Sequence, residues 1–157
     1  MDDKHYLNIA IARAKESAQN GCFPAGAAIV IDWHGQSVQY SAMSGNDLDF
    51  RHAELRVIEN AIDATKQNVV RGLTLYASME PCMMCLAAAY WNGISRIVYA
   101  IPQSRVNPEY YGSSLSTETI NNSLSMPLEL VHLDELENVA LDILKEWEST
   151  ANRLISE

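Results

Sequence analysis

The sequence has few positive charges and no long hydrophobic run. Only 11 of its 157 residues are Lys or Arg, against 20 Asp or Glu, so the formal net charge is −9 at pH 7. Because proteins bind nucleic acids through basic side chains that neutralise phosphates, we expect no large nucleic-acid interface. No stretch approaches the roughly 18 consecutive apolar residues of a membrane span, and the first residues lead into no signal-like segment. We therefore expect a soluble, cytoplasmic protein with no membrane partner.

Cysteine, glycine and proline are also scarce. Three cysteines, an odd number, do not suggest a disulfide framework, so their roles are more in keeping with packing, metal binding or redox chemistry. The seven glycines and five prolines form no linker, and no repeat or low-complexity segment interrupts the chain. We expect a single domain over residues 1–157, which is long enough to bury a sizeable core.

The hydrophobic pattern alternates predicted helices with predicted strands. Apolar residues at helical spacing predict four main helices, at about 7–18, 52–64, 83–91 and 133–147. Short apolar or alternating segments predict five strands, at 27–31, 37–41, 73–77, 96–100 and 128–131, of which the first two form a β-hairpin. Most of 102–127 is expected to be loop, with room for a short helix. This order favours an α/β fold of three layers, with a mixed five-stranded sheet between two layers of helices.

Two short motifs place chemically active residues at predicted helix starts. His52-Ala53-Glu54 opens the second helix, and Pro81-Cys82-Met83-Met84-Cys85 opens the third. Given the composition, His-x-Glu is expected by accident about 0.3 times and Pro-Cys-x-x-Cys only about 0.001 times. The second motif is therefore unlikely to occur by chance. The first is weak alone and becomes informative only because both motifs occur in the same chain.

These residues offer three ligands for a zinc ion. Cys82 and Cys85 lie three apart on one helix face, close to the positive helix end that favours thiolates. With His52 they make the three-ligand set that leaves a fourth zinc position for water. His52 and Glu54 can reach one site only at a helix end, because two residues of a regular helix turn by about 200°. Glu54 beside that water would carry protons.

Other interpretations of these residues stay open. The two cysteines could be a redox pair, although the segment after them looks buried. A closed structural zinc site would need a fourth protein ligand, for which the candidates are Cys22, His5, His34 and His132. His52 could be a hydrogen-bonded core residue and Glu54 a carboxylate that suits a helix start. A noncatalytic zinc-binding interaction module would keep the metal without needing Glu54.

With these motifs the chain resembles the zinc-dependent cytidine and deoxycytidylate deaminase superfamily. The segment 23–27, Phe-Pro-Ala-Gly-Ala, is similar to the family's first strand, and 75–85 to the strand-to-helix junction of its purine-deaminating branch. That branch holds bacterial guanine deaminases and tRNA adenosine deaminases. The Tyr90-Trp91 pair and the spacing from Tyr111-Gly112 to Met126-Pro127 are closer to the guanine deaminases. The resemblance implies a cytidine-deaminase-like fold, zinc on His52, Cys82 and Cys85, and Glu54 as the catalytic residue.

The resemblance further implies hydrolytic deamination of an aminated nucleobase, nucleoside or related heterocycle, with a guanine-deaminase-like activity first and a tRNA adenosine deaminase as the alternative. The family places a substrate-binding Asn about eleven residues before the metal His, where this chain has Ser41, and Asn46 lies six residues before His52. Guanine deaminases also use an acidic loop residue and a C-terminal aromatic residue, and neither is evident at 111–115 or 155–157.

The expected substrate is a flat small molecule, which needs stacking faces and a few polar groups. For this pocket we expect contributions from Phe23, Ala25, Ser41, Asn46, Trp91 and Tyr111. Relatives in the family complete their active sites across a dimer interface, so the resemblance also implies a homodimer.

Overall fold

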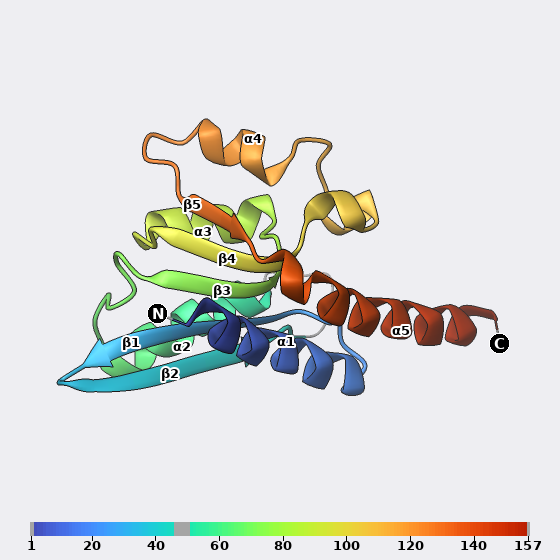
Figure 1. The fold of residues 1–157 in the computed structure, drawn as a ribbon, viewed down its shortest axis with the longest axis horizontal. Helices are drawn as coiled ribbons and strands as arrows, with labels where there is room; N and C mark the ends of the chain where they lie inside the picture. Colours follow the sequence, from blue (N-terminus) through green and yellow to red (C-terminus); the bar gives the residue numbers. More distant parts are fainter. Residues whose placement is uncertain (1, 46–50, 157) are drawn as a thin grey trace.

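The computed structural model describes residues 2–45 and 51–156, which form a mixed sheet with helices on its two faces (Figure 1). The helices are α1 (Asp3–Gln19), α2 (Ala53–Thr65), α3 (Met83–Trp91), α4 (Thr117–Asn122) and α5 (Glu137–Ser156). The strands are β1 (Gly26–Trp33), β2 (Gln36–Met43), β3 (Thr74–Met79), β4 (Arg96–Ile101) and β5 (Glu129–His132). Three single 3-10 turns complete the described segments: η1 (Gln103–Arg105), η2 (Pro108–Tyr110) and η3 (Asp134–Leu136).

The five strands lie in the order β2-β1-β3-β4-β5. β1 is antiparallel to both β2 and β3, whereas β4 is parallel to β3 and to β5. The β1–β2 hairpin turns at His34 and Gly35, whose φ angles of 50° and 79° are typical of a two-residue type I′ turn. The predicted hairpin and the predicted mixed five-stranded sheet are both confirmed.

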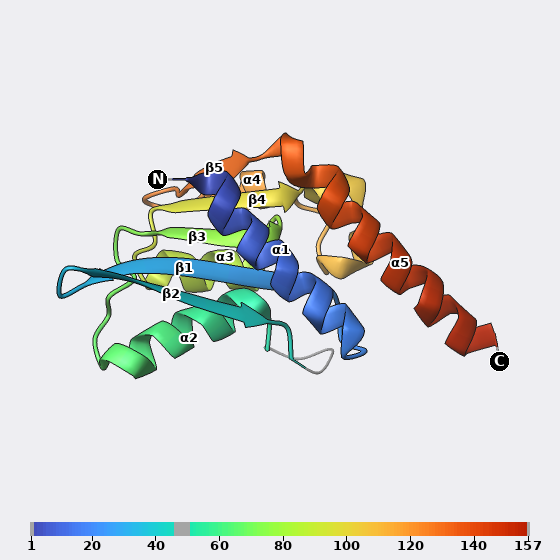
Figure 2. The ribbon, with the colours of Figure 1, turned by 60° about the horizontal axis from the view of Figure 1, so that its bottom comes forward.

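Alternate residues of the central strands point to opposite layers of helices. Leu75 and its β4 neighbour Ile97 pack in one core cluster with α2 and α3, and the next pair, Tyr76 and Val98, packs in another with α1 and α5. This follows from the two-residue period of a strand. Figure 2 shows α1 and α5 on one side of the sheet and α2 on the other. The predicted three-layer α/β fold is therefore confirmed.

The C-terminal region differs in detail from the sequence expectation. The long helix starts at Glu137 because η3 occupies 134–136 and the Leu133 amide is bonded to the Tyr99 carbonyl at 2.9 Å. Between β4 and β5 the expected loop carries η1 and η2, and α4 is the short helix that the sequence allowed there. In both ribbon views α5 extends past the edge of the sheet (Figures 1 and 2). None of the helices within the described residues is long and apolar enough to cross a membrane.

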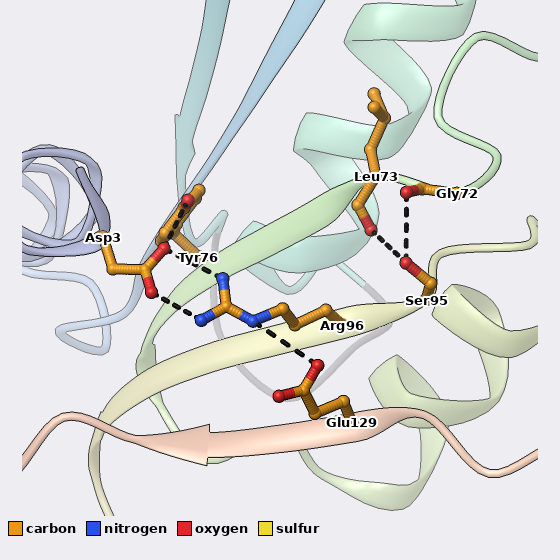
Figure 3. A network of polar contacts seen from close by, with 7 residues as sticks. All are labelled: Asp3, Gly72, Leu73, Tyr76, Ser95, Arg96 and Glu129. Carbon is orange, nitrogen blue, oxygen red and sulfur yellow. Dashed lines mark hydrogen bonds and ion pairs between the residues drawn. The ribbon is translucent and has the colours of Figure 1, made fainter. Parts of the chain in front are cut away.

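A polar network ties α1 to the amino ends of β3 and β4 (Figure 3). The Arg96 guanidinium binds both carboxylate oxygens of Asp3, and the Tyr76 hydroxyl donates to Asp3 Oδ1 at 2.9 Å. Arg96 also lies 3.7 Å from a Glu129 carboxylate oxygen on β5. The hydrogen bonds from Arg96 hold the pKa of Asp3 below its ordinary value. The network fixes the end of the sheet remote from the carboxyl ends of β3 and β4.

Candidate metal centre and active site

The starts of α2 and α3 are built in the same way. His52 is the N-cap of α2 with extended backbone angles (φ −67°, ψ 150°), and Cys82 is the N-cap of α3 with φ −71° and ψ 170°. Because an N-cap residue lies outside the helical spiral, its side chain can share a site with residues of the first turn. The side chains of His52 and Glu54 can therefore point to one site, and so can those of Cys82 and Cys85. This is the helix-end geometry that the two-residue spacing of His52 and Glu54 requires.

The two helix starts bring one imidazole and two thiols together. His52 Nδ1 lies 3.5 Å from Cys82 Sγ and 3.4 Å from Cys85 Sγ, and the three ligand atoms all lie within 4.8 Å of one another. One nitrogen and two sulfur ligands suit zinc, which takes thiolate and imidazole in tetrahedral sites. In the described part of the chain no fourth His, Cys, Asp or Glu joins this group. The ligand set therefore fits zinc with an open position better than a closed structural site.

Glu54 lies directly beside these ligands. Its side chain is only 7% exposed, and Cys85 Sγ is 3.5 Å from Glu54 Oε2. Removal of the carboxylate from water raises the pKa of Glu54 to about 7, and the nearby Cys82 thiolate acts in the same direction. A carboxylate with such a pKa can take up and release protons near neutral pH.

The two thiols ionise at different pH values because they share a hydrogen bond. The bond from Cys85 lowers the pKa of Cys82 to about 4, with a further contribution from His52. Donation of that bond, together with burial, raises the pKa of Cys85. Cys82 is thus readily held as a thiolate, and the proton of Cys85 would be released to solvent when a cation binds its sulfur.

A cavity of about 460 Å³ opens onto this cluster, a size suited to a small organic ligand. Three of the residues expected from the sequence line it: Phe23, Ala25 and Tyr111. Asn46 lies outside the described residues, and Arg51, at the start of the next described segment, lines the cavity. The structure therefore brings about half of the expected pocket residues to the candidate site.

Ser41 and Trp91 are not brought to the cavity. Ser41 pairs with Ala28 in the hairpin, and its hydroxyl accepts a hydrogen bond from Arg13 Nε of α1 at 3.0 Å. Trp91 is the last residue of α3 and is 78% exposed. At 1.5 Å per residue, a nine-residue helix places it about 12 Å from the helix start that carries the ligands. Neither side chain is among those that line this cavity.

Sequence patterns missed Glu109, Tyr110 and Trp147, which also line the cavity. No acidic residue was evident at 111–115, but Glu109 lies just before that range in η2, whose start is marked by Asn107 and Pro108. Trp147 has the spacing of a core residue on α5, and periodicity alone does not separate a pocket wall from a core. The Asn-Pro turn signal could have found η2, whereas no sequence signal identified Trp147.

The loop after β4 is bonded to the junction that carries Cys82. The Gln103 amide donates to Glu80 Oε2 at 2.7 Å, and the Tyr111 hydroxyl donates to the Glu80 carbonyl at 2.7 Å. The Thr117 hydroxyl donates to the Pro81 carbonyl, also at 2.7 Å. These bonds satisfy buried polar groups and fix the turn immediately before the thiol ligands.

A three-layer α/β fold with His and Cys ligands at paired helix starts defines a zinc-binding α/β domain. The family described as cytidine and deoxycytidylate deaminase zinc-binding region matches residues 1–101, and the chain belongs to it. The resemblance derived from the sequence motifs is thereby confirmed, together with zinc as the metal of this family.

Curated relatives carry several activities in their names. The tRNA-specific adenosine deaminase of Agrobacterium fabrum is 33% identical over 97 residues, which is 60% of this chain and 62% of that protein. That of Bacillus subtilis is 31% identical over 97 residues, 62% of this chain and 60% of its own length. A probable cytosine deaminase of Schizosaccharomyces pombe is 28% identical over 136 residues, 82% of each chain. The chain thus spans about three fifths of the tRNA-specific relatives.

Solved structures share the fold. A structure from a study of tRNA:A34 deaminases has a TM-score of 0.67 at 26% identity and covers 84% of this chain and 99% of its own. Guanine deaminase from Nitrosomonas europaea has a TM-score of 0.70 at 19% identity, with 92% and 83% coverage. Because relatives are named as tRNA deaminases, the comparisons do not support the expectation that a large nucleic-acid interface is absent.

Proposed function

We propose that the chain is a zinc-dependent hydrolytic deaminase that releases ammonia from a small aminated heterocycle, with a guanine-like base as the first candidate. The observation that carries the proposal is the position of Glu54, a buried carboxylate beside the His52, Cys82 and Cys85 ligand set at a cavity of about 460 Å³. A noncatalytic metal site has no chemical need for that carboxylate.

His52, Cys82 and Cys85 would hold the metal. Bound zinc supplies Lewis acidity, which allows water to lose a proton near neutral pH. Glu54 accepts that proton because its pKa of about 7 keeps a substantial fraction ionised at neutral pH.

Glu54 then returns protons to the substrate. Deamination replaces the exocyclic carbon–nitrogen bond by a carbon–oxygen bond, with water as co-reactant and ammonia as leaving group. Glu54 donates to the ring nitrogen as the oxygen adds, and it assists proton transfer to the departing amine. Its burial excludes bulk water, so the same carboxylate serves both transfers.

The lining of the cavity supports a small substrate without phosphate. Phe23 and Tyr111 supply aromatic surface for a flat ring, and the Glu109 carboxylate can accept hydrogen bonds from ring or amine N–H groups. Glu54, Glu80 and Glu109 outnumber Arg51 among the charged lining residues. A phosphate group would therefore meet net negative charge.

The second candidate is deamination of an adenosine within tRNA. It is favoured by the relatives named as tRNA-specific adenosine deaminases. The charge distribution opposes it, because residues 129–157 contain eight acidic and two basic residues and would repel a polyanion.

We also propose that residues 1–157 form one domain and that two copies form a homodimer in the cytoplasm. One sheet spans β1 to β5, and the reduced Cys82 and Cys85 thiols suit a reducing compartment. Met83 and Trp91 expose apolar side chains on α3, at 46% and 78%. Exposed aromatic surface of this kind is typical of an interaction face.

The proposed function is tested by ammonia release from zinc-loaded protein, with Glu54→Ala as the blank. The substrates are guanine, adenine, cytosine, their nucleosides, aminated triazines and pterins, and a tRNA anticodon stem-loop. Glu54-dependent release from one small heterocycle supports the proposal. Release from the stem-loop alone establishes the second candidate instead. Bound zinc with no release from any of them favours a noncatalytic zinc-binding interaction module.

A further inference from the structure

The turn between β3 and α3, residues 80–82, ends at the candidate ligand Cys82, and we call it the ligand turn. The Pro81 carbonyl of this turn accepts a hydrogen bond from the Thr117 hydroxyl at the start of α4, at 2.7 Å. Thr117 is only 1% exposed, so this bond is buried. Thr117 also lies outside residues 1–101, the part of the chain that matches the zinc-binding region of the family. A residue from another segment thus contacts the turn that leads into the metal ligand.

Cys82 depends on the ligand turn for its position more than Cys85 does. As the N-cap of α3, with φ −71° and ψ 170°, Cys82 lies outside the helical spiral, whereas Cys85 lies in the first turn of the helix. The Pro81 carbonyl and the Cys82 amide belong to one planar peptide group, so the bond from Thr117 fixes the orientation of that plane. Rotation of the plane would move Cys82 Sγ relative to His52 Nδ1, from which it lies 3.5 Å.

The helix that supplies this hydroxyl is held at both ends. The Thr117 amide donates to Gln103 Oε1 at 2.9 Å, and the Gln103 amide donates to Glu80 Oε2 of the ligand turn at 2.7 Å. The Thr117 hydroxyl lies 3.3 Å from the same Gln103 oxygen, so its 2.7 Å contact with the ligand turn is the better hydrogen bond. At the far end of α4 the buried Asn121 side chain bonds to the amide and the carbonyl of Leu128, at 2.9 and 2.7 Å. These contacts include no metal ligand, so they can hold α4 in place before an ion binds.

We propose that Thr117 is a positioning residue of the metal centre, whose hydroxyl holds Cys82 in the orientation that binds the ion. It acts through the Pro81 carbonyl and is not itself a ligand. Removal of the hydroxyl leaves that carbonyl buried without this partner, and the ligand turn must shift to find another. Groups that orient metal ligands in this way typically change metal affinity by about 10- to 100-fold when they are lost. The inference rests on the ligand set of the proposed function and is independent of the reaction.

The test measures zinc affinity by competition with a chromophoric chelator, under conditions in which each zinc-free protein is folded. Thr117→Val keeps the shape of the side chain without the hydroxyl and should weaken zinc binding at least about tenfold. Thr117→Ser keeps the hydroxyl and should retain most of the affinity. Thr119→Val is the matched control, since Thr119 is an exposed residue of the same helix whose hydroxyl bonds to Ser116, and it should leave the affinity unchanged.

A second control separates positioning from a general loss of stability. Tyr76→Phe removes a hydroxyl that donates to Asp3 in the network of Figure 3, away from the ligand turn. In urea denaturation of zinc-free protein it should lower the free energy of unfolding, and it should leave zinc affinity unchanged. If Thr117→Val destabilises the zinc-free fold but binds zinc as tightly as wild type, Thr117 supports only the fold and the inference is overturned.

Cobalt(II) gives a spectroscopic measurement of the same effect, because its absorption reports thiolate ligation and coordination geometry. At saturating cobalt, Thr117→Val should show altered thiolate-to-cobalt and d–d bands, whereas Thr117→Ser and Thr119→Val should match wild type. Identical spectra of Thr117→Val and wild type would overturn the inference.

Two further variants keep the outcome clear. If Thr117→Val does not fold, Gln103→Met replaces it, because it removes the acceptor of the Thr117 amide and keeps the backbone bond to Glu80. It should also weaken zinc binding, and an unchanged affinity would overturn the inference. None of these measurements uses ammonia release, so failure of the deaminase reaction leaves the role of Thr117 standing. A wrong ligand set shows separately, as full zinc loading of Cys85→Ala, and would overturn both.

Discussion

His52 Nδ1 lies 3.4 Å from Cys85 Sγ although 33 residues separate the two positions in the chain. The contact joins the start of α2 to the first turn of α3, at the end of the sheet where the central strand β3 finishes. It shows why two motifs that are short and far apart form one site.

The first prediction concerns the metal ligands. Cys85→Ala removes one of two sulfur ligands and should lower zinc content from about one ion per chain to below about one tenth, since loss of a ligand weakens a three-ligand site sharply. Zinc is measured by mass spectrometry on purified protein. Cys22→Ala is the matched control, because Cys22 lies outside the ligand cluster. Full loading of Cys85→Ala would show that the ligand set is wrong.

The second prediction concerns stability and pH in zinc-free protein. Burial raises the pKa of Glu54 to about 7 from 4.5, so the folded state binds more protons than the unfolded state between these values. The neutral Glu54 side chain therefore supports the free energy of unfolding fully below pH 4.5. This contribution is lost as the pH rises through 7, because the buried carboxyl group then ionises. Glu54→Gln should remove this loss, which is up to about 3 kcal/mol at 1.36 kcal/mol per pKa unit.

Urea denaturation at pH 4.5, 6 and 7.5 measures the effect as the difference between wild type and variant. Glu59→Gln is the control, since Glu59 lies on the same helix with an exposed side chain. A pH dependence of the unfolding free energy that is identical in wild type and Glu54→Gln would contradict the burial argument.

The third prediction concerns the network in Figure 3. Asp3→Ala removes the acceptor of Arg96 and of Tyr76 and should lower the free energy of unfolding by about 1–2 kcal/mol, because the bonds are charge-assisted and only partly exposed. Glu135→Ala breaks an ion pair with Lys4 in which both side chains are about half exposed, and should cost less than about 1 kcal/mol. Urea denaturation at pH 7 compares them. Equal losses of unfolding free energy would show that the Asp3 network stabilises the fold no more than an exposed ion pair does.

The fourth prediction concerns assembly. Trp91→Glu places a charge on the most exposed part of α3 and should convert a homodimer into a monomer. Light scattering should give twice the 17.5 kDa of one chain for wild type and one chain for the variant. A wild-type mass near 17.5 kDa would show that the protein is monomeric.

Much of the fold was predictable because hydrophobic period depends on local sequence. The alternation at Leu75 and Tyr76 and the helical spacing of Leu7 and Ile11 reflect which face each residue buries. The C-terminal helix starts later than expected, because the Leu133 amide, just after β5, bonds to the neighbouring strand β4. Such a contact between distant segments leaves no trace in local periodicity.

The candidate site was predictable only in part. His52, Glu54, Cys82 and Cys85 carry spacing signals, because side chains at a helix start must lie near one another. The spacing of Ser41 before His52 and the helical period of Trp147 do not show which of the two faces the cavity, because strand register and the packing of α5 decide this. Pocket walls built from separate segments therefore required the structure.

In the proposed function, Glu54 transfers protons in a zinc-dependent deamination. The most direct test measures bound zinc and ammonia release together for wild type and Glu54→Gln, with the best substrate of the panel at saturation. Zinc content should be equal in the two proteins, and kcat should fall by about 10²- to 10⁴-fold in Glu54→Gln, the usual range for a general acid–base residue. A Glu54→Gln protein that retains zinc and releases ammonia at nearly the wild-type rate would contradict it.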